Sequence, residues 1–546
     1  MSSTTPVFQS VYDAFRAAAE AHPDRTLFAL PAETASRYGL NEATQSYAQA
    51  ATGVDTLMQA YRDAGYRHGD RVALMLENRP EFFGHFLALN ALGVSIVPLH
   101  HEMQTDELAY RLQHSEAGLL VTLDAYRELA IDACAATGKT IPAVTPQESL
   151  PKTASSGRDG PNTRETEAAI LYTSGSTGTP KGCLLSNDYF LLMGEWYINQ
   201  GGYCVFGEDG ERILTPLPVS HMNALACSFM AAVMSGSCLI QLDRFHPRTW
   251  WSEVRETRAS IVHYLGVLPA ILLNLPASPD DDLSGQVKFG FGAGVDPRHQ
   301  EIFEARFGFP LIEAWAMTET GSGACVAASH EPRHVGTRCF GKAPDAMEYR
   351  IVDEQDQDTL PGEPGELLVR AAGPEPRRGF FTAYFKDKPA TEEAWSGGWF
   401  HTGDVVRIDD DRSFYFVDRR KNIVRRSGEN IAAVEVEGVL MQDQRVAACA
   451  VAPVPDELRG EEVMACIVAP DGIERSRESA VAIFEQALET LAYFKPPGYI
   501  AFVDQLPLTS SEKLQRGRVK ELCKELCDSG KAFDLRDMKR RPRSAH

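Results

Sequence analysis

The sequence predicts an α/β fold: a large N-terminal domain of sheets flanked by helices, carrying a β-rich subdomain, and then a small α+β C-terminal domain. Up to about residue 345, short apolar runs with the composition of buried strands alternate with helical segments. Beyond that point, strand-like runs are separated by Pro/Gly clusters, and a compact helix–strand unit follows residue 418. Buried strands that alternate with helices indicate parallel sheets covered on both faces.

The large domain is expected to begin with a helix and to continue with strand–helix–strand units. Val11, Phe15, Ala18 and Ala19 form one apolar helical face. The run 71–76 (RVALML) has the length and composition of a buried strand, and apolar residues at helical spacing follow it. Further strands are expected at 94–99, 118–123, 167–173, 212–217, 237–242 and 260–265.

The β-rich subdomain and the small domain complete the expected chain. Asp409-Asp410-Asp411 is typical of a turn between two strands rather than of a metal site. A basic cluster after Asp418 marks the expected hinge, near 418–421, between a large domain 1–418 and a small domain 419–546. The expected strands are 347–353, 365–370, 404–408, 414–417, 446–452 and 462–468, and the expected small-domain helices are 433–441 and 476–491.

Composition narrows the class of protein. The chain of 546 residues carries a net charge of −21, and an acidic surface repels phosphate backbones, so no nucleic-acid partner is expected. The basic end within 530–546, Lys539-Arg540-Arg541-Pro542-Arg543, is interpreted as a solvated tail. The 11 cysteines form no CxxC pair, which favours reduced thiols and a cytoplasmic location. No secretion signal and no run of 18 apolar residues is found, so no membrane span is expected.

Residues 172–182 (YTSGSTGTPKG) form the most informative stretch. Glycines let backbone N–H groups approach a ligand, successive N–H groups form an anion nest, and hydroxyls and a lysine add donors. The spacing differs from the Walker P-loop because Pro180 precedes Lys181 and Gly182 follows it. The stretch follows a buried strand, so it predicts a polyphosphate cradle. The expected phosphate-binding residues are Thr173, Ser174, Gly175, Ser176, Thr177, Gly178 and Lys181.

Six further motifs follow in order: LPVSHMNAL (217–225), FGFGAGV (289–295), EAWAMTET (313–320), WFHTGDVV (399–406), DRRKNIVRRSGENI (418–431) and LPLTSSEKLQRGRV (506–519). Together with the loop they resemble the acyl-adenylate-forming superfamily, which includes acyl- and aryl-CoA synthetases, peptide-synthetase adenylation domains and firefly luciferase. The resemblance covers residues 10–525, and the motif sequences are most similar to those of the carnitine/crotonobetaine-CoA ligase-like branch. It implies an AMP-forming acid–thiol ligase that uses a small-molecule carboxylic acid, ATP, Mg²⁺ and coenzyme A.

The resemblance assigns tasks in the first half-reaction, in which the acid displaces pyrophosphate to form acyl-AMP. Thr318 would offer a hydroxyl to the α-phosphate, Glu319 would ligate Mg²⁺ together with Thr177, and Trp315 would stack on adenine. Asp404 would accept both ribose hydroxyls. The expected adenine and ribose contacts are Gly292, Ala293, Gly294, Glu313, Ala314, Trp315, Asp404 and Arg419.

Other residues would act through a moving small domain. Lys513 matches the lysine that the family uses in adenylation, although Glu512 stands where glycine commonly precedes it. Lys421 matches the hinge, which implies that the small domain is mobile. Arg425 and Arg426 either meet CoA phosphates or face solvent. The residues expected at the thioester step are Arg425, Ser427, Gly428 and Glu429.

The acid is expected to be small to medium in size. His221 would gate or line the acyl channel, and Ala316, in place of the usual glycine, would narrow it. The expected wall residues are Trp196, Asn223, His263, Tyr264, Gly266 and Ala316. Two alternatives stay open: an adenylating enzyme that serves a carrier-protein pantetheine, and a nucleotide binder or ATPase, which the lack of a Walker motif disfavours. The oligomeric state is also open, with a homodimer as one alternative.

Overall fold

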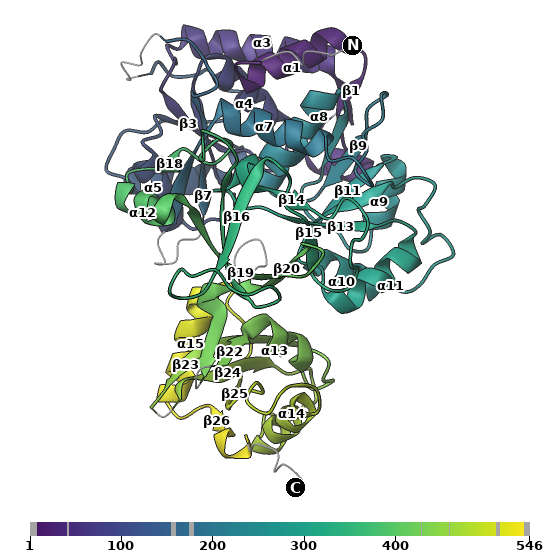
Figure 1. Cartoon of the computed structure of the whole chain (residues 1–546). Helices are drawn as coiled ribbons and strands as arrows, with labels where there is room; N and C mark the ends of the chain where they lie inside the picture. The colour runs from purple at the N-terminus through teal and green to yellow at the C-terminus, as the bar shows by residue number, and fades with distance from the viewer. Residues whose placement is uncertain are drawn as a thin grey trace.

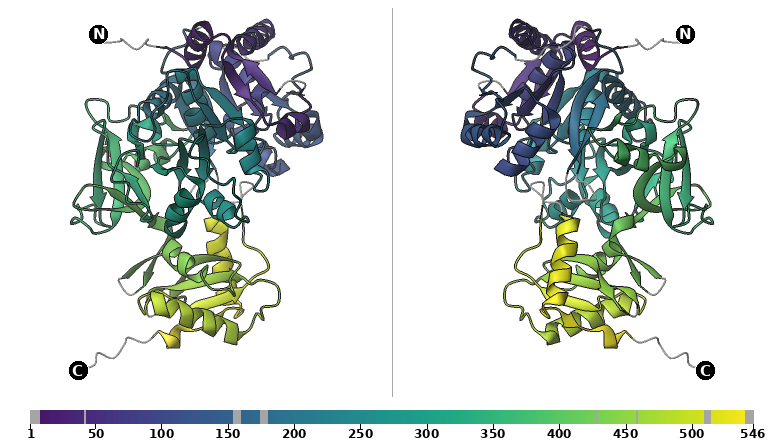
Figure 2. Two further views of the ribbon diagram at one scale, coloured as in Figure 1. Left: turned by 90° about the vertical axis from the view of Figure 1, so that its right-hand side faces the viewer. Right: turned by 90° about the vertical axis from the view of Figure 1, so that its left-hand side faces the viewer.

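The computed structural model of the chain describes residues 8–40, 43–153, 160–173, 180–426, 429–457, 459–508 and 514–539. It confirms the α/β fold, with a large domain above a small domain in Figure 1. Figure 2 shows the same division from both sides, and α15 (Arg516–Asp528, yellow) lies on the small domain where it approaches the large one.

Two sheets of mainly parallel strands form the frame of the large domain. Their neighbours are often not consecutive in the chain, so helices connect them as crossovers. One sheet has the order β14 (Val326–Ala327), β13 (Leu311–Trp315), β12 (Phe289–Ala293), β11 (Ile261–Leu265), β9 (Arg212–Thr215), β10 (Cys238–Gln241), β1 (Thr26–Ala29) and β2 (Thr44–Ser46). The other has the order β18 (Ala383–Tyr384), β8 (Lys181–Ser186), β7 (Glu167–Thr173), β4 (Ser95–Pro98), β3 (Arg71–Met75), β5 (Leu119–Thr122) and β6 (Ala143–Val144).

Helices join the two sheets through one continuous core. Phe83 of α4 contacts both Phe28 of β1 and Phe229 of α8, with ring centroids 5.3 and 4.5 Å apart. In the described part of the chain no helix has the length and apolar character needed to cross a membrane. The large-domain helices are α1 (Val11–Ala21), α2 (Ala32–Arg37), α3 (Tyr47–Asp63), α4 (Pro80–Ala91), α5 (Thr105–Ser115), α6 (Arg127–Ala136), α7 (Asn187–Ile198), α8 (Phe229–Ser235), α9 (Trp250–Glu256), α10 (Val267–Leu273), α11 (Pro297–Phe307) and α12 (Lys388–Ala394).

Local sequence explains several boundaries. Ser46 and Gln49 form a reciprocal capping box that begins α3. Pro80 stands in the first turn of α4, where its missing N–H costs nothing. Gly236 and Gly308 end α8 and α11 in the left-handed conformation that glycine adopts without strain.

The β-rich subdomain and the small domain each have a sheet of their own. The subdomain sheet has the order β15 (Cys339–Gly341), β20 (Phe414–Arg419), β19 (Phe400–Ile408), β17 (Gly365–Ala371) and β16 (Met347–Val352). The small-domain sheet has the order β22 (Glu429–Ala432), β21 (Ile423–Arg426), β24 (Gly460–Val468), β25 (Tyr499–Phe502) and β26 (Phe533–Asp534), with β23 (Ala448–Asp456) also on β24. Helices α13 (Ala433–Leu440), α14 (Arg477–Thr490) and α15 cover this sheet, and their apolar residues form separate cores. The boundary at residue 418 stays a prediction.

The end of the chain differs from the expected solvated tail. Residues 533–539 form β26 and a short 3₁₀ turn, and the side chain of Lys539 is fully buried. Its ammonium donates hydrogen bonds to the Glu462 carboxylate and to the carbonyl of Phe494. Glu462 also pairs with Arg426, at 2.7 Å. The interpretation of Lys539 as solvated was wrong because a buried anion binds it; residues 540–546 lie outside the described part.

Candidate active site

One cavity of about 1110 Å³ lies where the carboxyl ends of strands from both large sheets meet the small domain. Val434, Leu514 and Arg516 contribute the small-domain side of its wall. Ligands of open α/β sheets bind at the carboxyl ends of the strands, so this cavity is the candidate site. The sequence-predicted residues that line it are His221, Gly266, Ala293, Gly294, Glu313, Ala314, Trp315, Ala316, Asp404 and Arg419.

Trp315 and Asp404, predicted to bind adenine and ribose, contact each other. The indole N–H of Trp315 donates to Asp404 Oδ2 at 2.9 Å, and Phe340 stacks on the indole with centroids 6.0 Å apart. Arg419, the cross-strand partner of Asp404, places its Nε 2.6 Å from Asp404 Oδ1. Burial raises the pKa of the Asp404 carboxyl, while Arg419 and the indole hydrogen bond oppose the rise. A carboxylate beside an aromatic ring suits a ribose next to a base.

A buried carboxylate, Glu313 of β13, also lines the cavity and holds the loop after β12. Glu313 accepts hydrogen bonds from the N–H groups of Gly294 (2.8 Å) and Val295 (3.2 Å) and from the Tyr264 hydroxyl (2.6 Å). Burial raises the pKa of Glu313 to about 7, and these hydrogen bonds oppose the shift. A Cβ at Gly292 would lie 2.2 Å from the Tyr264 carbonyl oxygen, so this strand contact admits only glycine. Glu313 thus shapes the wall against which a base would lie.

Thr173 and Lys181 bracket the predicted phosphate loop as cross-strand partners on β7 and β8. Thr173 Oγ1 donates to Glu319 Oε1 at 3.2 Å, so the structure joins one end of the loop to the predicted metal ligand. The Tyr384 hydroxyl donates to the same oxygen at 3.0 Å, and Lys181 Nζ lies 3.9 Å from Asp387 Oδ2. The loop residues outside the described part are Ser174, Gly175, Ser176, Thr177 and Gly178.

Lys513 lies outside the described residues, but the chain re-enters at the cavity immediately after it. Leu514 lines the cavity and forms an isolated β-bridge with Leu508, which closes the loop that carries Lys513. Arg516 also lines the cavity and is fixed by Glu437, whose Oε2 accepts from Arg516 Nη2 at 2.8 Å. The small-domain residues Leu514 and Arg516, which follow this loop in the chain, therefore line the cavity.

The predicted acyl end contains His221, Gly266 and Ala316. The side chain of His221 is exposed at the start of an irregular helical turn, Asn223–Ser228, of the π type that often marks functional sites. A Cβ at Gly266 would lie 1.8 Å from the Gly294 carbonyl oxygen, so the two loops touch through backbone alone. Thr318 is half-buried two residues beyond Ala316.

Four residues expected in the acid pocket are not among those that line the cavity: Trp196, Asn223, His263 and Tyr264. His263 is fully buried, with Nε2 at 2.9 Å from the Tyr197 hydroxyl. Its Nδ1 lies 2.9 Å from both the Ser228 hydroxyl and Asn223 Oδ1. Burial lowers the pKa of His263 to about 3, so it stays neutral. Its partners account for this histidine as a hydrogen-bonded centre of the core.

Of the residues predicted for the hinge and the thioester step, the three whose side chains the structure describes, Lys421, Arg425 and Arg426, are not among those that line the cavity. Lys421 is exposed in the 3₁₀ turn Arg420–Asn422. Arg425 forms an ion pair of 2.7 Å with Glu354 of the large domain. Arg426 was expected at CoA phosphates or in solvent; instead it is buried against Glu462, because the end of β21 packs on β24. Ser427 and Gly428 lie outside the described residues, and the side chain of Glu429 is not described.

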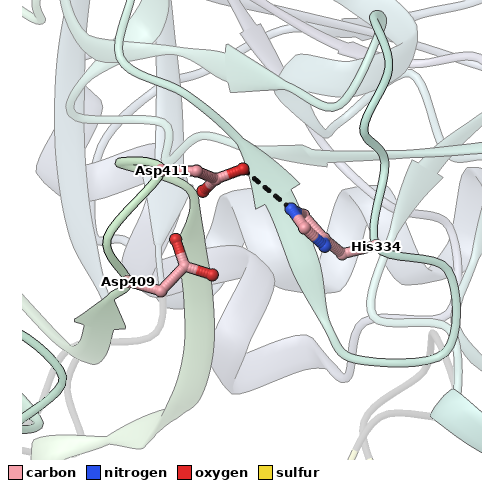
Figure 3. A group of neighbouring side chains, drawn as sticks. All are labelled: His334, Asp409 and Asp411. Atoms are coloured by element: carbon pink, nitrogen blue, oxygen red, sulfur yellow. Dashed lines mark hydrogen bonds and ion pairs between the residues drawn. The ribbon is translucent and has the colours of Figure 1, made fainter.

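The Asp409-Asp410-Asp411 triplet forms the expected turn, between β19 and β20. Figure 3 shows the imidazole of His334 pointing at the Asp411 carboxylate, with Nε2 and Oδ2 3.0 Å apart. Lys342 Nζ lies 3.3 Å from the same carboxylate, and the Ser413 N–H donates to both Asp409 and Asp411. The His334 imidazole, the Lys342 ammonium and the Ser413 N–H account for the carboxylates as parts of a hydrogen-bonded turn.

Sequence reasoning missed several residues that the fold brings to the site. Tyr384 reaches Glu319 from a two-residue strand, and Arg338 lines the cavity near Glu313. A further arm of the cavity is lined by six residues that no motif singled out. They are Arg37, Tyr38, Glu77, Arg79, His100 and His101. Tyr384 could have been noticed as an aromatic residue inside the polar stretch TAYFKDK, but no spacing rule links it to Glu319.

Fold and site together define a two-domain, nucleotide-dependent class of enzyme. The family model of the AMP-binding enzyme matches residues 15–381, and the model of the AMP-binding enzyme C-terminal domain matches residues 435–513. The chain belongs to the AMP-binding enzyme family.

Curated relatives and solved structures agree with this assignment. The chain is 29% identical over 491 residues to crotonobetaine/carnitine–CoA ligase of Citrobacter koseri, covering 87% of this chain and 93% of the relative, and the same figures hold for the enzyme of Salmonella arizonae. The fold is similar to o-succinylbenzoate CoA synthetase of Bacillus subtilis in complex with its acyl-adenylate (TM-score 0.77, 24% identity, 94% and 98% of the two chains). It is also similar to ATP-bound MatB of Rhodopseudomonas palustris (TM-score 0.77, 23% identity, 94% and 99%).

Proposed function

We propose that the chain activates a small to medium carboxylic acid as acyl-AMP, with release of pyrophosphate, and then transfers the acyl group to coenzyme A. One observation carries the proposal. One cavity is lined by Asp404 and Trp315, by the expected acyl-channel residues His221 and Gly266, and by Leu514, the residue that follows Lys513 in the chain.

The first step needs positive charge around an anion that attacks a polyanion. A carboxylate oxygen of the acid attacks the α-phosphorus of ATP, the bond to the bridging oxygen breaks, and pyrophosphate leaves. In our proposal, Lys181 and the N–H groups of its loop hold the β- and γ-phosphates, and Lys513 neutralises charge that develops at the α-phosphate. Asp404 and Trp315 hold the nucleoside so that the acid meets the phosphorus in line.

The residues present fit a magnesium ion. Glu319 offers a buried carboxylate, and Thr173 offers a hydroxyl beside it, which are the hard oxygen donors that Mg²⁺ prefers. A bound Mg²⁺ would shield the phosphate oxygens and help pyrophosphate to leave. In our proposal Glu319 holds the ion, and Tyr384 and Thr173 orient that carboxylate.

In the second step, the thiol sulfur of coenzyme A forms a bond to the acyl carbon, the thiol proton leaves, and AMP departs with the phosphate oxygen. In our proposal the small domain rotates about Lys421 and brings the hairpin of β21 and β22 to the cavity. The Arg425–Glu354 ion pair would then have to break. Both side chains are about half exposed, so this costs little.

The acid is proposed to be compact. Ala316 and Gly266, whose backbone touches that of Gly294, both line the cavity, and in our proposal they limit the size of the acyl group. Crotonobetaine and carnitine, the acids in the names of the curated relatives, are the first to test. A carrier-protein pantetheine is the alternative acceptor. A cytoplasmic location and a homodimer are further proposals; the 11 cysteines are all free thiols, which suits a reducing compartment.

The direct test is ATP–pyrophosphate exchange with a panel of acids. Exchange that requires an acid supports adenylation, whereas acid-independent phosphate release would support an ATPase. Hydroxamate trapping with and without coenzyme A distinguishes a CoA acceptor from a carrier protein. We expect Lys513→Ala to abolish exchange and to leave thioester formation from supplied acyl-AMP largely intact. Equal loss in both half-reactions would contradict the proposed roles.

A further inference from the structure

We propose that Tyr384 is a positioning residue that couples the phosphate-binding lysine, Lys181, to the metal-binding carboxylate, Glu319. The inference rests on the proposed function and adds a residue that none of the motifs contains. Tyr384 uses two parts of its side chain for this purpose. The hydroxyl contacts Glu319, and the ring lies beneath the ammonium of Lys181.

The hydroxyl fixes one oxygen of the carboxylate. Tyr384 donates to Glu319 Oε1 at 3.0 Å, and Thr173 donates to the same oxygen at 3.2 Å. Two donors on one oxygen fix the rotation of the carboxylate, so its other oxygen has a defined direction toward a cation.

The ring seats the lysine without binding it tightly. Lys181 Nζ lies 4.9 Å from the Tyr384 ring centroid, within the range of a cation–π contact. Its acidic neighbour, Asp387, is at 3.9 Å, too far for a hydrogen bond. An ammonium held in this way can turn toward an arriving phosphate at small cost, while its stem stays at the end of the loop.

The backbone that carries Tyr384 is itself held in place. Strand β18 pairs with β8, which places Tyr384 opposite Cys183, two residues from Lys181. The Tyr384 N–H donates to Thr391 Oγ1 at 3.0 Å, and the ring packs on Phe381 with centroids 4.7 Å apart. These contacts orient the ring independently of any ligand, so the tyrosine can serve as a fixed point between lysine and carboxylate.

The two parts of the side chain predict separable effects. Tyr384→Phe keeps the ring and removes only the hydroxyl, so it should weaken binding of Mg·ATP or Mn·ATP about tenfold, the loss expected for one hydrogen bond to a charged group. Binding of AMP, which needs neither the metal nor Lys181, should be unchanged. Tyr384→Leu also removes the ring, so it should weaken the binding of metal-free ATP as well as that of Mg·ATP.

The measurement is calorimetric titration of the full chain with ATP and AMP, with and without Mg²⁺, together with the Mg²⁺ dependence of ATP–pyrophosphate exchange. Tyr349→Phe is the matched control, because its hydroxyl contacts Arg412 on the β-rich subdomain, away from the cavity. Thermal melts show whether each variant is folded. The inference is overturned if Tyr384→Phe binds Mg·ATP as tightly as the wild type, or if it loses as much affinity for AMP as for Mg·ATP. In either case, ATP–pyrophosphate exchange by the wild type would still support the proposed function. A wild type without exchange overturns the proposed function as well.

Discussion

Replacing Glu462 with glutamine should destabilise the small domain far more than replacing Lys539 with methionine. Glu462 is the one anion in a fully buried group that also contains Arg426 and Lys539, with side-chain exposures of 0%, 2% and 0%. Glutamine keeps the shape of the side chain but leaves two buried cations facing a neutral group. Methionine at 539 removes one cation and leaves the Arg426–Glu462 pair intact.

The magnitudes follow from the contacts. Removing one partner of a buried ion pair costs about 3–5 kcal/mol, because the remaining charge is left uncompensated in the interior. Lys539→Met loses the hydrogen bonds to Glu462 and Phe494, but it also removes the desolvation cost of burying a second cation. The net change in the free energy of unfolding should therefore stay within about 1 kcal/mol. Glu462 Oε1 would still accept from the Val463 N–H at 2.8 Å.

The assay is hydrogen exchange, measured by mass spectrometry across a urea series, on peptides from β21 and β24 of the full chain. All six tryptophans lie before residue 400, so tryptophan fluorescence follows the large domain separately and serves as the internal control. Equal destabilisation by the two substitutions, or a change below about 1 kcal/mol for Glu462→Gln, would refute the reasoning.

The wild type and Lys539→Met also supply a test of pH dependence. Burial lowers the pKa of Lys539 to about 8 from its ordinary value of 10.5, while Glu462 opposes this shift. Between these two pH values the unfolded state binds more protons than the folded one, so the free energy of unfolding should rise with pH across this window. Lys539→Met should lack that part of the rise; parallel pH profiles would contradict it.

Three further predictions concern the cavity. Trp315→Phe removes the hydrogen bond to Asp404 but keeps an aromatic ring, so KM for ATP should rise about tenfold with little change in KM for the acid, as steady-state kinetics would show. The affinity of the wild type for AMP should weaken as pH falls through about 7, because the ionised Glu313 holds the Gly294 loop best. Glu313→Gln should bind AMP weakly at every pH, and calorimetric titrations over a pH series would measure both proteins. Ala316→Gly widens the acyl end and should raise kcat/KM for bulkier acids by about 10–200-fold relative to the smallest active acid, in the same exchange panel.

The order of elements could be predicted because its signals are local. The run 71–76 is apolar on both faces and forms β3, Arg71–Met75, and the run 167–173 forms β7 over the same residues. The motifs also located residues around the cavity: Trp315 ends β13, as the motif implies, and Asp404 lies within β19. His263, expected in the acid pocket, is not among the residues that line the cavity, and its burial and three hydrogen-bonding partners are not visible in the sequence.

By itself, the sequence determined the alternation of strands and helices and the family of the chain, and it predicted a phosphate loop after the strand 167–173. Only the tertiary structure decided that Trp315 bonds to Asp404, 89 residues away, that Tyr384 reaches Glu319 across 65 residues, and that Lys539 is buried on Glu462, 77 residues away. The physical reason is that periodicity and backbone preference act over a few neighbouring residues, whereas these contacts depend on how sheets and domains pack. No local pattern states which distant polar groups will share a buried site.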